Sequence, residues 1–141
     1  MILPDVNILL HAFRKDSVRH EEARGWLQET VNGAEPFGIS PQTLASLIRI
    51  STNRRIYPNA SSLAEGLEFS ATLLKAEHCV PIHAGGRHWA IFEELCRTLN
   101  ATGNLVQDAW FAALAIEAGC EWITTDRDYS RFPGLRWRQP F

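Results

Sequence analysis

The 141-residue chain has no surplus of positive charge and few cysteines. Its 14 Lys and Arg residues stand against 16 Asp and Glu residues, for a formal net charge of -2. This balance excludes a protein that binds nucleic acid through an overall positive field, so any such contact must be local. Cys79, Cys96 and Cys120 are an odd number without paired spacing. They argue against a disulfide framework and favour a reducing compartment, the cytoplasm.

Long hydrophobic runs are also missing. The N-terminal apolar stretch is interrupted at His11 and ends before Arg14 and Lys15, so it is too short for a signal peptide or a membrane span. We therefore expect no membrane association. Nor is there an internal repeat, a low-complexity tract or linker composition. With 45% hydrophobic residues, the chain is long enough for one well-buried core, and a single domain over residues 1–141 is expected.

Short apolar stretches alternate with amphipathic segments along the chain. Strands are predicted over residues 1–5, 36–40, 79–82 and 120–125. Helices are predicted over residues 8–14, 17–33, 42–52, 62–76, 87–100 and 107–119. This alternation indicates an α/β fold with a mostly parallel sheet covered on both faces. Among the helix ends, Asn7 is expected to cap the first helix, and Ser62 with Glu65 to form a capping box.

The stretch PDVN places polar residues inside the first apolar run. An ionised carboxylate is costly to bury unless something pairs with it. Asp5 should therefore reach solvent at the end of its strand or have a cationic partner.

Two further acids are expected at the same edge of the sheet as Asp5. Asp108 lies near the start of a predicted helix, and Asp126 directly follows the last predicted strand. A helix of roughly 11 residues rises about 16 Å and a strand of roughly 6 residues covers about 20 Å, so the two lengths nearly cancel. In a right-handed strand-helix-strand unit, the start of the helix and the end of the next strand then meet at the C-terminal edge of the sheet, where ligands bind.

Three carboxylates gathered at one edge, with Asp128 close behind, would repel one another and raise one another's proton affinity unless a cation neutralised them. A site made only of oxygen ligands suggests Mg²⁺ or Mn²⁺. Singly, each of these acids could equally be a helix cap or a turn residue.

The segments PDVNILLHAF, NLVQDAWFAALAIEAG and ITTDRDYSRFPGLRW resemble the first, third and fourth motifs of the PIN-domain family, in particular of VapC-like ribonuclease toxins of toxin-antitoxin modules. The resemblance covers essentially the whole chain. It implies a three-layer α/β/α sandwich around a central, mostly parallel five-stranded sheet. It also implies a divalent-metal site, RNA cleavage, a homodimer and a cognate VapB-like antitoxin.

The resemblance assigns roles residue by residue. Asp5, Asp108 and Asp126 match the metal-binding, catalytic acids. Asn7, Thr125 and Ser46 are supporting positions, and Asp128 matches an auxiliary acid that could also bind the metal. Such a site would hydrolyse RNA phosphodiester bonds through a metal-activated water, without a side-chain nucleophile.

One position departs from the family pattern. The second motif usually has a Glu in the helix after the second strand, and Ser46 stands in that place. One negative ligand fewer favours weak or single-metal binding, although Gln42 and Thr43 could offer neutral oxygens. The departure also leaves open an alternative function, a non-catalytic PIN-like module that binds RNA or a partner.

Contacts with RNA could come from basic and aromatic residues in the loop after residue 52 and near the C-terminus. The candidates for phosphate contact are Arg54, Arg55, Arg127, Arg131, Arg136 and Arg138, and those for base stacking are Tyr129 and Trp137. Scattered arginines are normally solvated surface. A zinc site built from Cys79, His83, His88 and Cys96 is disfavoured, because the spacing matches no common zinc motif.

Overall fold

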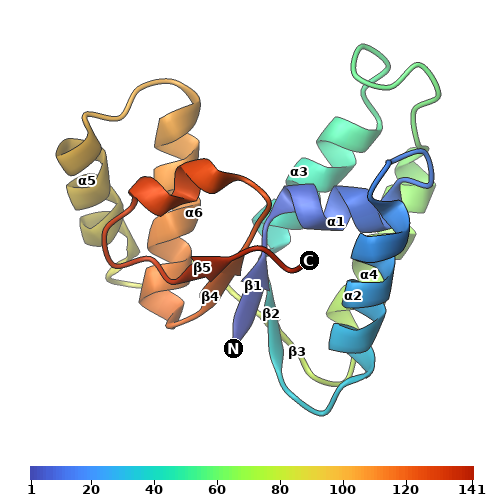
Figure 1. Cartoon of the computed structure of the whole chain (residues 1–141), viewed down its shortest axis with the longest axis horizontal. Coiled ribbons are helices and arrows are strands. Elements are labelled where there is room, and N and C mark those ends of the chain that lie inside the picture. The colour runs from blue at the N-terminus through green and yellow to red at the C-terminus, as the bar shows by residue number, and fades with distance from the viewer.

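The computed structural model describes all 141 residues and confirms the α/β class. Strands alternate with helices over most of the chain, as Figure 1 shows. The strands are β1 (Ile2–Pro4), β2 (Phe37–Ile39), β3 (Cys79–Pro81), β4 (Glu121–Ile123) and β5 (Trp137–Arg138). The helices are α1 (Val6–Phe13), α2 (His20–Asn32), α3 (Pro41–Ser51), α4 (Leu63–Leu74), α5 (His88–Leu99), α6 (Asn104–Ala118) and the short 3₁₀ helix η1 (Arg127–Arg131).

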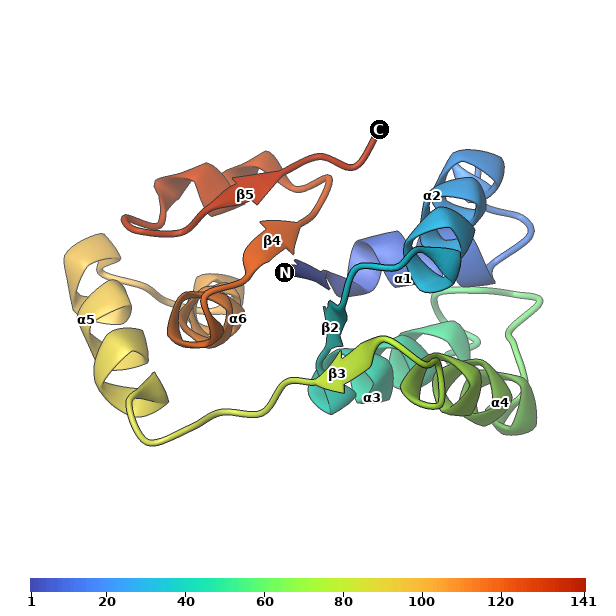
Figure 2. The same cartoon turned by 90° about the horizontal axis from the view of Figure 1, so that it is seen from below.

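All strand pairs are parallel. β4 lies between β1 and β5 in a three-stranded sheet, and β2 pairs with β3 in a two-stranded one. Figure 2 shows β2 next to β1, so the five strands lie side by side. Gly38 permits this approach, because a Cβ atom there would lie 3.1 Å from the backbone oxygen of Ile2. The single five-stranded sheet expected from the family resemblance is thus divided by its backbone hydrogen bonds into three and two strands.

Two hydrophobic clusters pack against the sheet. One joins α5 and α6 to β4 through residues such as Leu95, Leu114 and Trp122. The other joins α1 to α4 with β2 and includes Leu9 and Phe37. Helices therefore cover the sheet on both sides, with α5 and α6 at one end of Figure 2 and α1 to α4 at the other. No helix in the structure combines the length and the apolar character needed to span a bilayer.

Several expected helix ends are corrected. α1 begins at Val6 and is capped by Asp5, whose side chain accepts a hydrogen bond from the Val6 amide. The prediction that Asn7 caps this helix was wrong, because the chain turns into helix directly after β1 and Asn7 already lies in the first turn. The capping box of Ser62 and Glu65 is confirmed.

Two differences affect the acidic edge. α6 begins at Asn104, three residues earlier than predicted, so Asp108 lies in its second turn and not in its first. β5 was not recognised from the residue pattern, because it has only two residues and no apolar alternation to reveal it. Figure 1 nevertheless shows α6 starting at the end of the sheet where β1 and β4 finish, as the length argument predicted.

Candidate active site

The register of β1 and β4 places Asp5 beside the end of β4. Leu3 pairs with Trp122 and Pro4 with Ile123, and the Asp5 amide donates a hydrogen bond to the Ile123 oxygen at 2.9 Å. One step further along the two parallel strands, Asp5 and Thr124 are neighbours. β1 ends here because the Asp5 side chain starts α1.

Asp5 is a buried carboxylate with no cationic partner. It is 6% exposed and forms no ion pair. Its Oδ1 accepts from the Val6 amide at 2.6 Å, and its Oδ2 accepts from the Thr124 hydroxyl at 2.7 Å. Burial raises the pKa of Asp5 to about 6, and the charges of Asp108 and Asp126 add to that rise while the two hydrogen bonds oppose it.

Thr124 links the polar groups of this edge. It is fully buried, and its Oγ1 accepts hydrogen bonds from the Asn7 amide group and from the Asp126 backbone N–H, both at 3.0 Å. Its own hydroxyl proton goes to Asp5. The sequence interpretation overlooked this residue and took Thr125 as the supporting hydroxyl. Thr125 follows one position later, is half-buried, and its side chain forms no hydrogen bond within the protein.

Asp108 and Asp126 come from α6 and from the turn after β4. Burial raises the pKa of Asp108, and the neighbouring charge of Asp126 raises it further. Asp126 caps η1 by accepting the Asp128 amide on its Oδ1 at 2.9 Å. Asp128 itself is exposed, and its own electrostatic effect on Asp108 is a smaller contribution to the raised pKa.

Tyr129 belongs to this edge as a buried residue. Its hydroxyl donates to Asp108 Oδ1 at 3.4 Å, while its ring packs between Trp122 and Phe132. Burial and the nearby carboxylates raise the pKa of its hydroxyl. With 2% of its surface exposed, Tyr129 cannot stack on a base, and that expectation was wrong.

A single pocket gathers the three acids predicted from the sequence. Its lining residues are Asp5, Val6, Asn7, Asn104, Gln107, Asp108, Phe111, Asp126 and Tyr129. Asn104 and Gln107 bring side-chain amides to the pocket rim. Neither was foreseen as a site residue, and the predicted helix began only at Gln107. Asn7 Oδ1 is buried without a hydrogen-bond partner.

This donor set is chemically suited to a hard divalent cation. Carboxylate and amide oxygens are what Mg²⁺ and Mn²⁺ prefer, and the unpartnered Asn7 oxygen and the uncompensated charge of Asp5 are both deficits that such an ion would meet. The three acids share this pocket without converging on one point, since no group of three or more His, Cys, Asp or Glu residues is arranged to hold a metal ion.

Other predicted residues lie outside this pocket. Ser46 is half-buried on α3 and does not line it, and of its neighbours Gln42 is exposed while Thr43 is buried with its hydroxyl unpartnered. The arginines expected at RNA are exposed, and two of them are engaged at the surface, Arg136 with the Gly119 oxygen and Arg138 with Glu121.

Three of the four residues of the disfavoured zinc site serve the fold, and the fourth, His83, is exposed. His88 is buried, and its Nε2 is hydrogen-bonded to the Trp110 oxygen at 2.9 Å. Cys79 lies on β3 and Cys96 on α5, and both pack against the hydrophobic clusters.

Comparison with known proteins places this geometry in a family. A family model described as PIN domain matches residues 2–135. The chain is 38% identical over 140 residues to the VapC ribonuclease Mb2897 of Mycobacterium bovis, covering 99% of this chain and 95% of that protein. It is 35% identical to ribonuclease VapC25 of Mycobacterium tuberculosis, covering 99% of both.

Solved structures share the fold. VapBC-1 from nontypeable Haemophilus influenzae superposes with a TM-score of 0.70 at 16% identity, covering 99% of this chain and 98% of that one. VapC20 from Mycobacterium tuberculosis, described as a sarcin-ricin loop cleaving toxin, superposes with a TM-score of 0.63 at 18% identity and covers 96% of this chain and 99% of that one.

Proposed function

The chain belongs to the PIN-domain family, and we propose that it is a VapC-type endoribonuclease toxin that depends on Mg²⁺ or Mn²⁺. Its curated relatives at 32–38% identity are named as ribonucleases, and the matches cover nearly the whole length of each.

The observation that carries the proposal is the buried, unpaired charge of Asp5 in a pocket shared with Asp108 and Asp126. A purely structural role gives no reason to hold three carboxylates together without a cation, because their repulsion destabilises the folded chain. The arrangement becomes favourable once a divalent ion binds there.

Asp5, Asp108 and Asp126 would bind the ion, and Asn7, which lines the same pocket, carries a buried oxygen without a hydrogen-bond partner. When bound, Mg²⁺ or Mn²⁺ would supply the positive charge that polarises a phosphodiester and makes water a better nucleophile. Thr124 donates to one Asp5 oxygen and the Val6 amide to the other, so the carboxylate is held in a fixed orientation. Tyr129 restrains Asp108 in the same way, so both acids are oriented before substrate arrives.

Water attack on the phosphodiester would leave a 5'-phosphate and a 3'-hydroxyl. No side chain near the acids offers a competing nucleophile, because the Thr124 hydroxyl is buried and donates to Asp5. The phosphate is expected to enter over the exposed rim formed by Asn104 and Gln107.

We propose that the chain acts with an antitoxin partner. Several structural neighbours were solved as VapBC toxin-antitoxin complexes, which supports a VapB-like antitoxin for this chain. An antitoxin arginine could take the place of the metal among the carboxylates, since a guanidinium pairs bidentately with them. We also propose a homodimer acting on cellular RNA in the cytoplasm.

The decisive experiment is cleavage of structured RNA, including a sarcin-ricin loop oligonucleotide, with Mg²⁺, with Mn²⁺ and in excess chelator. We expect cleavage only with metal, and loss of it in Asp5→Asn and Asp126→Asn variants that melt cooperatively. Glu94→Gln is the matched control, because Glu94 is an exposed acid on α5 outside the pocket. Full cleavage in chelator, or full activity of both Asn variants, would refute the metal mechanism.

The toxin assignment has its own test. Expression of the chain alone should arrest growth, and coexpression of the neighbouring antitoxin gene should restore it. RNA binding without cleavage under every metal condition would instead support the non-catalytic alternative.

A further inference from the structure

A second groove lies along α1 and shares one lining residue with the acidic pocket. It is lined by Asn7, Leu10, His11, Arg14, Asp16, Ser17 and Tyr57. Asn7 also lines the acidic pocket, so the two hollows share a wall. The face of α1 at positions 7, 10, 11 and 14 forms the floor, because residues three and four apart lie on one side of a helix.

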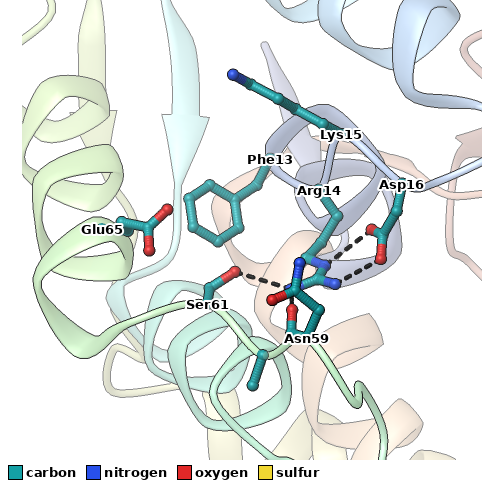
Figure 3. A pocket seen from close by; sticks show the side chains of 8 residues that line it. Phe13, Arg14, Lys15, Asp16, Asn59, Ser61 and Glu65 are labelled. Carbon is teal, nitrogen blue, oxygen red and sulfur yellow. Dashed lines mark hydrogen bonds and ion pairs between the residues drawn. The ribbon is translucent and has the colours of Figure 1, made fainter.

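Arg14 is the fixed point of this groove. Its side chain is 7% exposed, and its guanidinium donates to both Asp16 oxygens, to the Asn59 backbone oxygen at 2.9 Å and to the Ser61 hydroxyl at 3.0 Å. Figure 3 shows the side chain reaching from the end of α1 to the loop that carries Asn59 and Ser61. With its donors engaged inside the protein, Arg14 is not a free cation for phosphate.

Arg14 instead supports an aromatic ring. The guanidinium carbon lies 4.0 Å from the centroid of the Tyr57 ring. This contact holds one face of the ring against a rigid, hydrogen-bonded plane. Tyr57 is only half-buried and lines the groove.

We propose that Tyr57 is a substrate-binding residue on which a base of the RNA stacks, one or two nucleotides from the phosphate at the acidic pocket. The inference rests on the proposed ribonuclease function and adds to it where the substrate lies. Arg14 is the positioning residue that holds the ring.

The dimensions suit this placement. Arg14 follows Asn7 by seven positions, which corresponds to about 10 Å along a helix. A single strand that places one phosphate at Asp5 therefore reaches the groove with a flanking nucleotide. The strand would leave past the exposed Arg54 and Arg55, which belong to the same loop as Tyr57 and can approach its phosphates.

The chemistry of the groove fits a base better than a phosphate or an apolar peptide. Its charged groups, Arg14 and Asp16, neutralise each other. Besides Asn7 and the Tyr57 hydroxyl, its polar groups are the Ser17 hydroxyl and the His11 ring, which are joined by a hydrogen bond of 2.6 Å and can serve the edge of a base. Stacking on a fixed aromatic ring is tolerant of base identity, and the polar edge could add preference.

The test compares Tyr57→Leu, Tyr57→Phe and the parent on a short RNA that the parent cleaves, made with an abasic nucleotide at each position around the cut. Tyr57→Leu should lower kcat/KM about tenfold, and Tyr57→Phe should preserve it, because the ring is what stacks. An abasic nucleotide at one position next to the cut should lower kcat/KM of the parent about tenfold and should not lower kcat/KM of Tyr57→Leu further. Trp89→Leu, which removes an exposed aromatic ring on α5, is the control and should behave as the parent.

Anisotropy with the same RNAs in chelator applies the comparison to binding and does not need cleavage. If the parent cleaves no RNA, the proposed function fails, and the binding comparison still decides the role of Tyr57. The proposal would be overturned if every abasic substitution weakened cleavage and binding by the same factor in the parent and in Tyr57→Leu. Unchanged RNA binding combined with a weakened antitoxin complex would overturn it as well, and would assign Tyr57 to a protein interface.

Discussion

A buried charged residue lies at each end of α1, and only one of the two has a partner of opposite charge. At the N-terminal end, Asp5 is 6% exposed, has two hydrogen bonds and no cation, and lies near two more acids. At the C-terminal end, Arg14 is 7% exposed, and a carboxylate, a carbonyl, a hydroxyl and an aromatic ring surround it.

The difference distinguishes a site from a structural contact. The charge and the hydrogen-bond donors of Arg14 are paired within the chain, so this cluster stabilises the fold and fixes the α3–α4 loop. The Asp5 cluster leaves charge unbalanced and the Asn7 oxygen unpartnered, so it is completed only by something that binds.

The largest effect is expected when a charge is removed from the incomplete cluster. Asp108→Asn should lower RNA cleavage by at least about a thousandfold, because it removes a proposed metal-binding and catalytic acid. In chelator the same variant should melt at a higher temperature than the parent, because the pKa of Asp108 is raised by burial and by Asp126 and its charge is therefore unfavourable in the fold. Cleavage kinetics and thermal melts at pH 7 check both. A variant that loses activity and stability together would contradict this explanation.

Breaking the completed cluster should act on stability. Arg14→Met keeps much of the side-chain volume but removes the charged hydrogen bonds, so we expect a loss of about 3 kcal/mol in the free energy of unfolding. Urea denaturation measures it. Lys15→Met, at the exposed neighbour, is the matched control and should change stability by less than about 0.5 kcal/mol. A loss below about 1 kcal/mol for Arg14→Met would show that the Arg14 hydrogen bonds contribute little to the stability of the fold.

The pH dependence should expose the incomplete cluster without removing its acids. The folded pKa of Asp5, about 6, lies above its ordinary value of 3.8, so the folded chain binds the proton more tightly than the unfolded chain. The resulting stability is present below pH 4 and is lost as pH rises to about 6. The loss is on the order of 2–3 kcal/mol.

Other acids with lowered pKa values change stability in the opposite sense, so the informative quantity is the difference between the parent and Asp5→Asn in chelator. The free energy of unfolding of the parent minus that of Asp5→Asn should fall as pH rises from 4 to 6.5 and then level off. Denaturation at several pH values gives it. A difference independent of pH would mean that Asp5 is not held in an unfavourable charged form.

The smallest expected effect concerns the position that departs from the family pattern. Ser46→Glu adds a carboxylate to α3, and we expect a loss of about 1 kcal/mol in chelator from added repulsion and burial. Mn²⁺ should narrow or reverse this loss, because a ligand that binds only the folded state stabilises it. Ser46→Gln is the control of equal size without charge. Ser46 does not line the pocket, so destabilisation that metal does not relieve would show that an acid at position 46 of α3 does not reach the ion.

Much of the fold and the acids of the site could be read from local patterns. Helix and strand periods, the Ser62–Glu65 capping box and the order of elements do not depend on distant contacts. The same holds for Asp5, Asp108 and Asp126, because parallel topology alone brings the ends of strands and the start of a helix to one edge.

The supporting residues could not be read in this way. Thr124 and Thr125 are adjacent and chemically alike, and only the pairing of Pro4 with Ile123 decides that Thr124 lies beside Asp5. Tyr129 looked available for stacking, yet η1 turns its ring into the core between Trp122 and Phe132.

The sequence by itself therefore determined the class of fold, the order of its elements and the three acids, because hydrophobic period and strand direction are local properties that act over a few residues. Only the tertiary structure decided which hydroxyl orients Asp5 and which tyrosine is buried. It also decided that Tyr57 rests on Arg14 beside the acidic pocket. Those outcomes depend on strand register and loop closure, where residues 43 or 119 positions apart come into contact and a shift of one residue changes the partner.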